Sequence, residues 1–245
     1  MNNQLQTIVV NDKSFNIYLN NKTFNPTGTS DILLKSAIPF IENKNKNILD
    51  LGTGSGVLTI ALSHFKPKLN FYSSDLSISS YKLSNLNYKK NNLQVINKCG
   101  NLFEPWGQFK FDYIVNDVSG ISSKLASVSK WFNSVPSDSG IDGTKLTTKI
   151  IKNSKKYLNK NGIFFLPVLS LSNHKKTISY LSKNYKYSKK IGSKFWVMPK
   201  EFMKNDKNKN LLFLLKKKNQ IDFQIKFGIY TWQTDIYASS DRKFF

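Results

Sequence analysis

The chain has 245 residues, 40% of them hydrophobic, with a formal net charge of +22 and one cysteine, Cys99. This length suits one α/β domain with additions, and a lone cysteine excludes an internal disulfide and a cysteine-cluster metal site. No apolar run approaches the roughly 18 residues of a membrane span. The start also lacks the pattern of a signal peptide, so we expect a cytoplasmic, metal-independent protein that does not bind membranes.

The positive charge has two interpretations. A basic field attracts phosphate and so favours a nucleic-acid partner. However, Arg242 is the only arginine, whereas contacts to bases and phosphates favour arginine. A solvated basic surface therefore remains the alternative to a nucleic-acid site.

The first part of the chain predicts a small β-hairpin followed by a helix. Residues 7–10 and 15–19 have the composition of two short strands joined by a polar turn. A loop with proline and glycine follows, and Thr29 or Ser30 is a suitable N-cap for a helix that starts at Ile32. Pro39 should kink or end this helix.

Residues 47–58, with the sequence NILDLGTGSGVL, are the stretch around which the rest of the chain is organised. An apolar strand at 48–51 leads into a glycine turn, and a helix follows to about Phe65. Strand, glycine turn and helix together bring backbone amides and a helix N-terminus against a nucleotide-like ligand. A tight strand-to-helix turn of any α/β protein would have the same local pattern.

The next strand strengthens the ligand interpretation. Residues 69–74 form an apolar strand that ends at Asp75. An acidic residue roughly 20–25 positions after the glycines, at the tip of the next strand, is placed to accept hydrogen bonds from ribose hydroxyls.

The remaining elements alternate between helix and strand. We expect helices at 76–91, 122–131, 144–158 and 172–184, and strands at 94–97, 111–115, 163–168, within 187–198, and at 211–215. Residues 133–143 are a polar loop of the kind that forms substrate walls, with Trp131, Phe132 and Asp138 as candidate contacts. The aromatic tail from residue 221 is too apolar to be disordered throughout.

These motifs carry a family resemblance between about residues 24 and 168. The motif Asp-Leu-Gly-Thr-Gly-Ser-Gly, then Ser-Asp-Leu-Ser, then Asn-Leu-Phe-Glu at 101–104, resembles the class I S-adenosylmethionine-dependent methyltransferases. More narrowly, the chain is similar to the small-methyltransferase branch, which contains protein-glutamine and rRNA guanine-N2 methyltransferases.

The resemblance implies a cofactor and the residues that bind it. S-adenosyl-L-methionine would be held by Asp50, Gly52, Thr53, Gly54, Gly56, Asp75, Leu76, Asn101, Leu102 and Thr29. The glycine turn would hold the methionine part, Asp75 the ribose, and the turn at Asn101 the adenine. In the family the adenine position is often acidic, and here it is an amide that can still hydrogen-bond a base edge.

The loop after the fourth strand departs from the family. Relatives that methylate amide or base nitrogens have Asn-Pro-Pro-Tyr there, whereas this chain has Asp117, Val118, Ser119 and Gly120. Asp117 and Ser119 would face the methyl acceptor. A carboxylate at this point could take a proton from a hydroxyl or amine nucleophile, or hold a cationic amine. Otherwise it caps the next helix or faces water.

We therefore predict a Rossmann-like, seven-stranded, mostly parallel sheet with helices on both faces. The predicted divisions are an N-terminal hairpin and loop at 1–30, a cofactor domain at 31–218, and a C-terminal extension at 219–245 packed on that domain. The last core strand should be antiparallel, as in the family.

The predicted function is methyl transfer to an oxygen or nitrogen of an unidentified small molecule, protein or RNA. One alternative is an RNA or protein-glutamine N-methyltransferase. Another is a non-catalytic nucleotide- or RNA-binding module, which the altered loop and the charge favour. A nicotinamide-dependent oxidoreductase is disfavoured because the glycines are spaced Gly-x-Gly-x-Gly.

Overall fold

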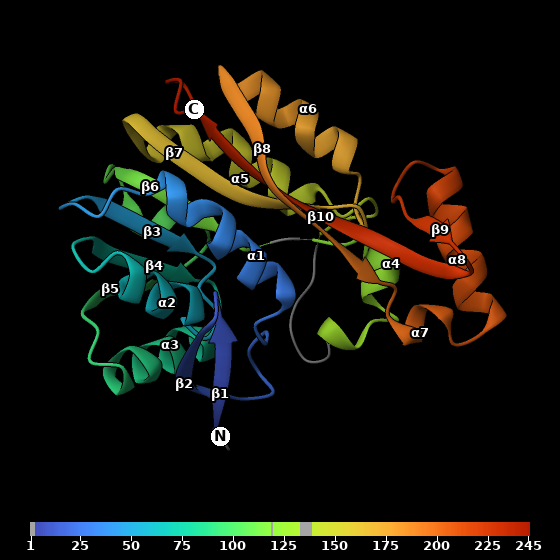
Figure 1. Ribbon diagram of the computed structural model, residues 1–245, viewed down its shortest axis with the longest axis horizontal. Helices are drawn as coiled ribbons and strands as arrows, with labels where there is room; N and C mark the ends of the chain where they lie inside the picture. The colour runs from blue at the N-terminus through green and yellow to red at the C-terminus, as the bar shows by residue number, and fades with distance from the viewer. Residues whose placement is uncertain (1–2, 119, 133–138) are drawn as a thin grey trace.

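A computed structural model describes residues 3–118, 120–132 and 139–245 (Figure 1). Within these residues, seven strands cross the main sheet and an eighth pairs at one end. Their order is β5 (Val95–Cys99), β4 (Asn70–Asp75), β3 (Asn47–Leu51), β6 (Phe111–Asn116), β7 (Leu158–Leu169), β10 (Ile229–Ser240) and β8 (Tyr187–Val197), and β9 (Gln224–Lys226) pairs with β10.

The sheet is mostly parallel, as predicted, apart from β10. The pairs β3–β4, β4–β5, β3–β6 and β6–β7 are parallel, and β10 runs antiparallel to both β7 and β8. Chain order reverses on either side of β3, because β4 continues the sheet in one direction and β6 in the other. Ligands of open α/β sheets bind at such a reversal, beyond the carboxyl ends of the strands.

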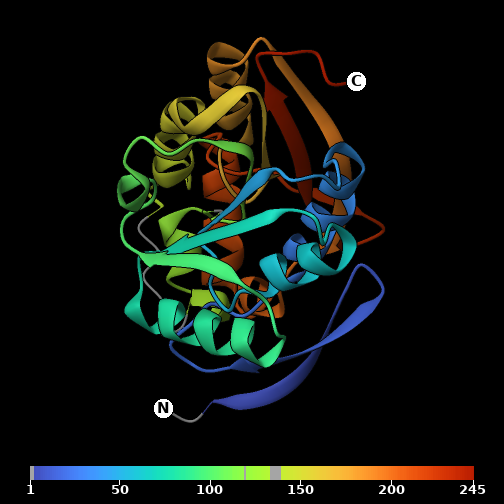
Figure 2. The same cartoon turned by 90° about the vertical axis from the view of Figure 1, so that its left-hand side faces the viewer.

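Helices cover both faces of the sheet (Figure 2). One layer contains α1 (Gly28–Ala37) and α2 (Val57–Phe65), with α3 (Ile78–Lys90) beside α2; the other contains α5 (Lys145–Ser154) and α6 (His174–Asn184). Each layer buries its own cluster of apolar side chains against the sheet. The single-turn 3₁₀ helices are η1 (Ile38–Phe40), η2 (Glu104–Trp106), η3 (Lys130–Phe132) and η4 (Lys155–Tyr157).

The N-terminal hairpin is confirmed as a separate two-stranded sheet of β1 (Gln4–Val10) and β2 (Lys13–Leu19). It is attached through Asn87 of α3, whose side chain is fully buried. The Asn87 amide accepts from the backbone N–H of Tyr18 at 2.7 Å and donates to its carbonyl at 2.9 Å. The same amide donates to the carbonyl of Ser55 at 2.8 Å, so one side chain joins the hairpin to the glycine turn.

The predicted strand at 211–215 is wrong, because these residues lie in helix α8 (Asp206–Lys217). The Asn205 side chain caps this helix by accepting from the N–H of Asn208. Leu212 and Leu215 are buried, while Phe213 and Leu214 remain about half exposed. This spacing is helical, and a five-residue apolar run does not by itself separate a helix from a buried strand.

The antiparallel strand comes instead from β10, within the predicted C-terminal extension. Trp232, Thr234, Ile236 and Ala238 are buried while the residues between them are partly exposed, which is the period of a strand. The sheet therefore does not follow the predicted boundary at residue 218. The boundary at residue 30 likewise falls inside α1.

Three helices differ in extent from their predictions. Helix α1 starts at Gly28, because Thr27 is its N-cap and forms a capping box with Ser30. Helix α4 (Ser123–Ala126) has a single turn, and the Ser129 hydroxyl accepts from the N–H of Trp131, a local bond that competes with helix continuation. Helix α5 ends at Ser154, and the following strand β7 starts with an irregular register.

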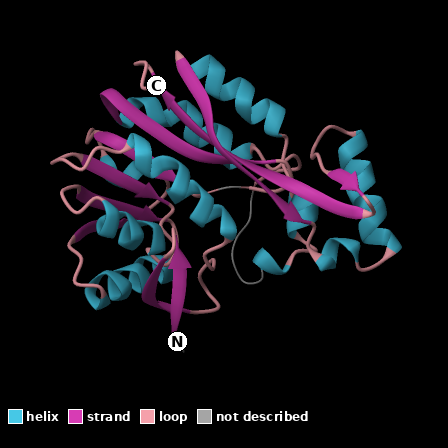
Figure 3. Cartoon of the chain, viewed as in Figure 1, coloured by secondary structure: helices cyan, strands magenta, loops and turns pink. Residues whose placement is uncertain are grey.

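A group of short elements lies beyond the main sheet, next to the C-terminal end of β8 and the N-terminal end of β10 (Figure 3). It comprises α4, α7 (Lys200–Met203), α8 and β9. These elements bury a third apolar cluster, which includes Met198, Phe202 and Trp232. We call this group the side lobe.

The hairpin between β9 and β10 contains one strained residue. Phe227 and Gly228 form its two-residue turn, with φ of 50° and 75°, and the Phe227 side chain is fully exposed. A two-residue hairpin turn with positive φ at both positions prefers the sequence Asn-Gly.

Replacing Phe227 by Asn should therefore stabilise the protein by roughly 0.5–1 kcal/mol. Urea unfolding curves measure this change. Phe227→Leu is the matched control, because leucine has the same difficulty with positive φ, and it should give no gain. A loss of stability in Phe227→Asn would show that the backbone of Phe227 is not strained.

Candidate active site

A cavity of about 770 Å³ opens at the carboxyl ends of the parallel strands. Its lining extends from the glycine turn on one side to Trp131, Trp196 and Trp232 on the other. Most of the predicted site residues line it: Thr29, Gly52, Thr53, Gly54, Asp75, Leu76, Asn101, Leu102 and Asp117. Ser119 and Asp138 lie outside the described residues.

The glycine turn follows β3 directly. Gly52 and Gly54 have φ of 76° and 56°, values that favour glycine over other residues. The amides of Gly52 and Thr53 both donate to the carbonyl of Ser74, at 2.8 and 3.0 Å. The turn is therefore fixed to the end of β4, and the cavity wall is formed by backbone without side-chain bulk.

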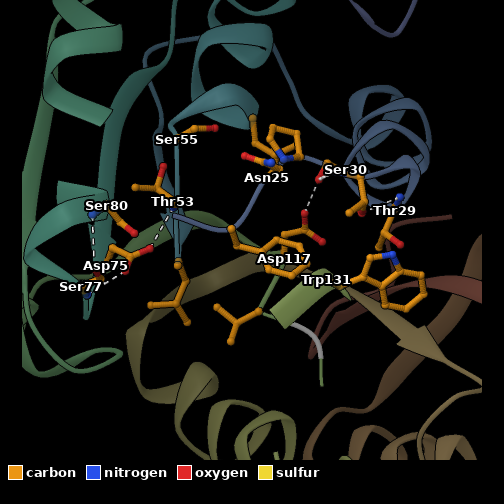
Figure 4. A pocket seen from close by; sticks show the side chains of 18 of the residues that line it. Asn25, Thr29, Ser30, Thr53, Ser55, Asp75, Ser77, Ser80, Asp117 and Trp131 are labelled. Carbon is orange, nitrogen blue, oxygen red and sulfur yellow. Dashed lines mark hydrogen bonds between the residues drawn. The ribbon is translucent and has the colours of Figure 1, made fainter. Parts of the chain in front are cut away.

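Asp75 occupies the position predicted for a ribose-binding residue. Its carboxylate accepts from the N–H of Gly54 and from the N–H of Ser77, both at 2.9 Å. Figure 4 shows it beside Ser77 and Ser80. Desolvation raises the pKa of Asp75 above its ordinary value, and the two amide hydrogen bonds oppose that rise. The Ser80 side chain also hydrogen-bonds this carboxylate, and of its about four lone-pair sites one stays open to a ligand.

Asp50 and Gly56 were predicted to contact the cofactor, but they are not among the residues that line the cavity. The buried Asp50 carboxylate accepts from the hydroxyls of Thr53 and Thr59, both at 2.7 Å. Gly56 has φ of 83°, and a Cβ there would lie 2.6 Å from the ring of Tyr88. Both residues shape the turn from behind, and their direct contact with the cofactor stays a prediction.

Two buried polar atoms behind the turn lack hydrogen-bond partners among the described residues. They are Oδ1 of Asp50 and Oγ of Ser55. Ser55 lines the cavity, and sequence reasoning missed it because the glycines around it dominate the motif. An unsatisfied buried hydroxyl beside a cavity costs free energy, so it indicates a polar ligand group at this point. Burial raises the pKa of Asp50 to about 6.

A largely apolar slot lies beside Asp75. Leu76 and Ile78 are 67% and 55% exposed and line the cavity together with Leu102. The Asn101 amide donates to the Glu104 carboxylate at 2.7 Å, which fixes the amide at the rim of this slot. Such a combination suits a planar base with polar edges. Trp106 is buried against Tyr72 and Phe111, as expected for a packing residue.

Asp117 stands on the opposite side of the glycine turn from Asp75. Its carboxyl group accepts from the buried Ser30 hydroxyl at 2.5 Å, the contact drawn in Figure 4. Ser30 belongs to α1, so Asp117 does not cap the helix that follows it. Desolvation raises the pKa of Asp117 to about 7, the Ser30 hydrogen bond opposes this, and the charge of Asp50 adds to it.

The far side of the cavity is lined by three indoles, Trp131, Trp196 and Trp232, which we call the tryptophan wall. The centroids of Trp131 and Trp232 are 5.7 Å apart, and those of Trp196 and Trp232 are 6.1 Å apart. Trp131 was predicted as a candidate contact, whereas Trp196 and Trp232 were missed. Their joint position depends on the pairing of β8 with β10, which no local motif signals.

In the described part of the chain, no group of three or more His, Cys, Asp and Glu side chains could hold a metal ion. A search of the same residues finds no helix with the length and apolar character needed to cross a membrane.

Known proteins share this domain and fold. Residues 27–117 match the family model of the methyltransferase small domain. A bifunctional methyltransferase of Rickettsia prowazekii is 28% identical over 233 residues, which cover 80% of this chain and 45% of the relative. A release factor glutamine methyltransferase of Thermodesulfovibrio yellowstonii is 30% identical over 152 residues, which cover 58% of this chain and 54% of the relative. The chain thus spans about half the length of these curated relatives.

Among solved structures, the 16S rRNA N2 G1207 methyltransferase of T. thermophilus, in complex with AdoMet and guanosine, has a TM-score of 0.64 at 13% identity. The match covers 98% of this chain and 51% of that one. This likeness shows a shared fold. Residues 27–117 carry the methyltransferase small domain, as the predicted resemblance implied. The family match ends at Asp117.

Proposed function

We propose that the chain binds S-adenosylmethionine and transfers its methyl group to a nitrogen or oxygen nucleophile. One observation carries this proposal: a single cavity joins the glycine turn and Asp75 on one side to the Asp117–Ser30 pair on the other. Cofactor and acceptor can therefore meet in one cavity, which is the main requirement for an in-line displacement.

The residues present fit the cofactor. Asp75 would accept from a ribose hydroxyl, and Leu76, Ile78 and Leu102 would flank the adenine. The turn from Gly52 to Ser55 would face the methionine part, where the unpartnered Ser55 hydroxyl would gain a hydrogen bond. When bound, the cofactor supplies an activated methyl group on a sulfonium centre.

Asp117 would act on the acceptor. In its ionised form the carboxylate accepts the proton that the nucleophile must lose, and the Ser30 hydroxyl holds it in position. General-base catalysis of this kind contributes about 100-fold or more to a rate. Asp117→Asn keeps the size of the side chain and removes the base, so we expect about a 100-fold slower transfer with cofactor affinity unchanged.

Transfer of labelled methyl into a cell lysate, divided into RNA, protein and small-molecule fractions, tests the activity. We expect label in one fraction, and none with Asp117→Asn on the same time scale. Label in RNA would give the positive charge a function. Failure to bind the cofactor would refute the proposal, and intact binding with no label in any fraction would favour the non-catalytic module.

The relatives favour a second candidate, N-methylation of a protein glutamine or of an rRNA base, because their names carry these activities. The loop at Asp117 counts against it. In its ionised form the Asp117 carboxylate is an acceptor only, so it cannot donate to the carbonyl oxygen of an amide as an asparagine side chain can.

The activity should also depend on pH through Asp117. Below its pKa of about 7 the carboxyl group is protonated and cannot accept a proton. We therefore expect kcat/KM for the acceptor to rise about tenfold per pH unit on the acid side. The rise should level off at or below pH 7, because the sulfonium cation of the bound cofactor lowers the pKa of a nearby carboxyl group. The same rise in Asp117→Asn would show that another group titrates.

A further inference from the structure

The net charge of the residues that line the cavity is opposite in sign to the net charge of the whole chain. The chain carries +22, yet the charged lining residues are Lys22, Asp75 and Asp117. Asp75 is held by two backbone amides beside the cofactor turn. Among the described residues no lysine or arginine forms a salt bridge with Asp117, whose hydrogen-bond partner is the Ser30 hydroxyl. A buried carboxylate without a cation is costly, so a bound cation would stabilise the ionised form of Asp117.

The tryptophan wall provides a surface that attracts such a cation. Indole faces bind ammonium groups more strongly than other aromatic rings do. One of these indoles already does so: the Nζ of Lys194 lies 4.4 Å from the ring centroid of Trp196. The ring of Trp196 is held in place because its Nε1 donates to the Thr234 hydroxyl at 3.0 Å.

The same geometry disfavours a stacked base. The ring centroids of Trp131 and Trp232, and of Trp196 and Trp232, are separated by distances at which aromatic rings touch each other. A base therefore finds no slot between Trp232 and either of the other two rings. The wall offers apolar faces and edges to a narrow aliphatic group, with a carboxylate in the same cavity.

Building on the proposed function, we propose that the acceptor is a primary alkylammonium group, the chemistry of a lysine side chain. Its aliphatic stem packs on Trp131 and Trp232, and Asp117 is its counter-ion.

The reaction then balances within the site. The ammonium group gives one proton to the Asp117 carboxylate and becomes a neutral amine. The amine nitrogen forms the new N–C bond to the methyl group while the carbon–sulfur bond breaks, and its electron pair stays on the sulfur, which becomes a neutral thioether. The product is a methylammonium group, and the Asp117 proton passes to solvent.

Binding of small probes tests this without turnover. The full chain is first saturated with S-adenosylhomocysteine and then titrated by calorimetry with n-butylammonium, butyramide or guanosine, which represent an amine, an amide and a base. We expect n-butylammonium to bind at least tenfold more tightly than butyramide, with a change in tryptophan fluorescence. Asp117→Asn should weaken it at least tenfold, whereas Asp206→Asn, the same change on exposed α8, should not.

A pair of substitutions at Trp131 separates aromatic attraction from packing. Trp131→Phe keeps an aromatic face and should stay within about threefold of the wild type, whereas Trp131→Leu should lose about tenfold. Methyl transfer to a lysine-containing peptide and to free n-butylamine then distinguishes a protein acceptor from a small amine.

The outcomes separate the two proposals. If S-adenosylhomocysteine does not bind, the proposed function fails. If it binds, but butyramide or guanosine binds better than n-butylammonium, or no probe binds, the amine acceptor is overturned and the cofactor assignment stands. Equal binding of n-butylammonium to the wild type and to Asp117→Asn also overturns it.

Discussion

Replacing Asp75 by Ala should weaken S-adenosylmethionine binding about 100-fold, which corresponds to about 2.7 kcal/mol. A ribose hydroxyl that donates to the carboxylate accounts for this, because a hydrogen bond to a charged group contributes roughly 1.5–3 kcal/mol. The substitution also leaves the amides of Gly54 and Ser77 without their acceptor, so the glycine turn loses part of its support.

Calorimetric titration measures the affinity, and a urea unfolding curve of the same sample shows that the variant is folded. Glu42→Gln is a suitable control, because Glu42 pairs with Lys44 and Lys46 on the surface. Wild-type affinity in a folded Asp75→Ala protein would show that the ribose assignment is wrong.

Replacing Asn87 by Asp should lower the free energy of unfolding by about 3 kcal/mol at neutral pH. The substitution changes one buried NH₂ group, which donates to the carbonyls of Tyr18 and Ser55, into an oxygen that faces both. The variant therefore places a buried negative charge against two acceptors. Because Ser55 lines the cavity, cofactor affinity should fall several-fold as well.

The pH dependence of the free energy of unfolding shows whether the buried charge causes the loss of stability in Asn87→Asp. Burial raises the folded-state pKa of the new carboxyl group above its unfolded value, so the folded state holds the proton more tightly. The deficit relative to the wild type should shrink as pH falls from 7.5 to 5, since the protonated group can donate to one carbonyl.

Asn91→Asp, the same change just after α3, where the side chain is partly exposed, should cost much less. A deficit in Asn87→Asp that does not change with pH would contradict this account.

The cofactor half of the cavity could be predicted from sequence because its residues are close in the chain and fixed by local geometry. A strand, three glycines and Asp75 at the next strand end specify one turn with positive φ at Gly52 and Gly54. Asp50 and Gly56 lie behind the turn, because the motif does not indicate which side of the backbone a side chain faces.

The acceptor half depends on long-range pairing, and there the prediction failed in part. The run at 211–215 was assigned as a strand because it is the most apolar segment in that part of the chain. Buried and partly exposed residues alternate from Trp232 to Ala238, which is typical of a strand. The polar residues in this segment made the pattern hard to recognise from the sequence. Without β10 in the sheet, nothing placed Trp196 next to Trp232.

The position of β10 also affects the order in which the chain folds during synthesis. The strands that carry the glycine turn and Asp117 pair with neighbours made before or soon after them. Among the described strands, β8 pairs with β10 alone and must wait until β10 has been inserted beside β7. Until then a nascent chain presents the open edge of β7, and such edges invite pairing with other chains. The half of the cavity that we propose to bind the acceptor is thus completed last, and it is the half most exposed to misfolding.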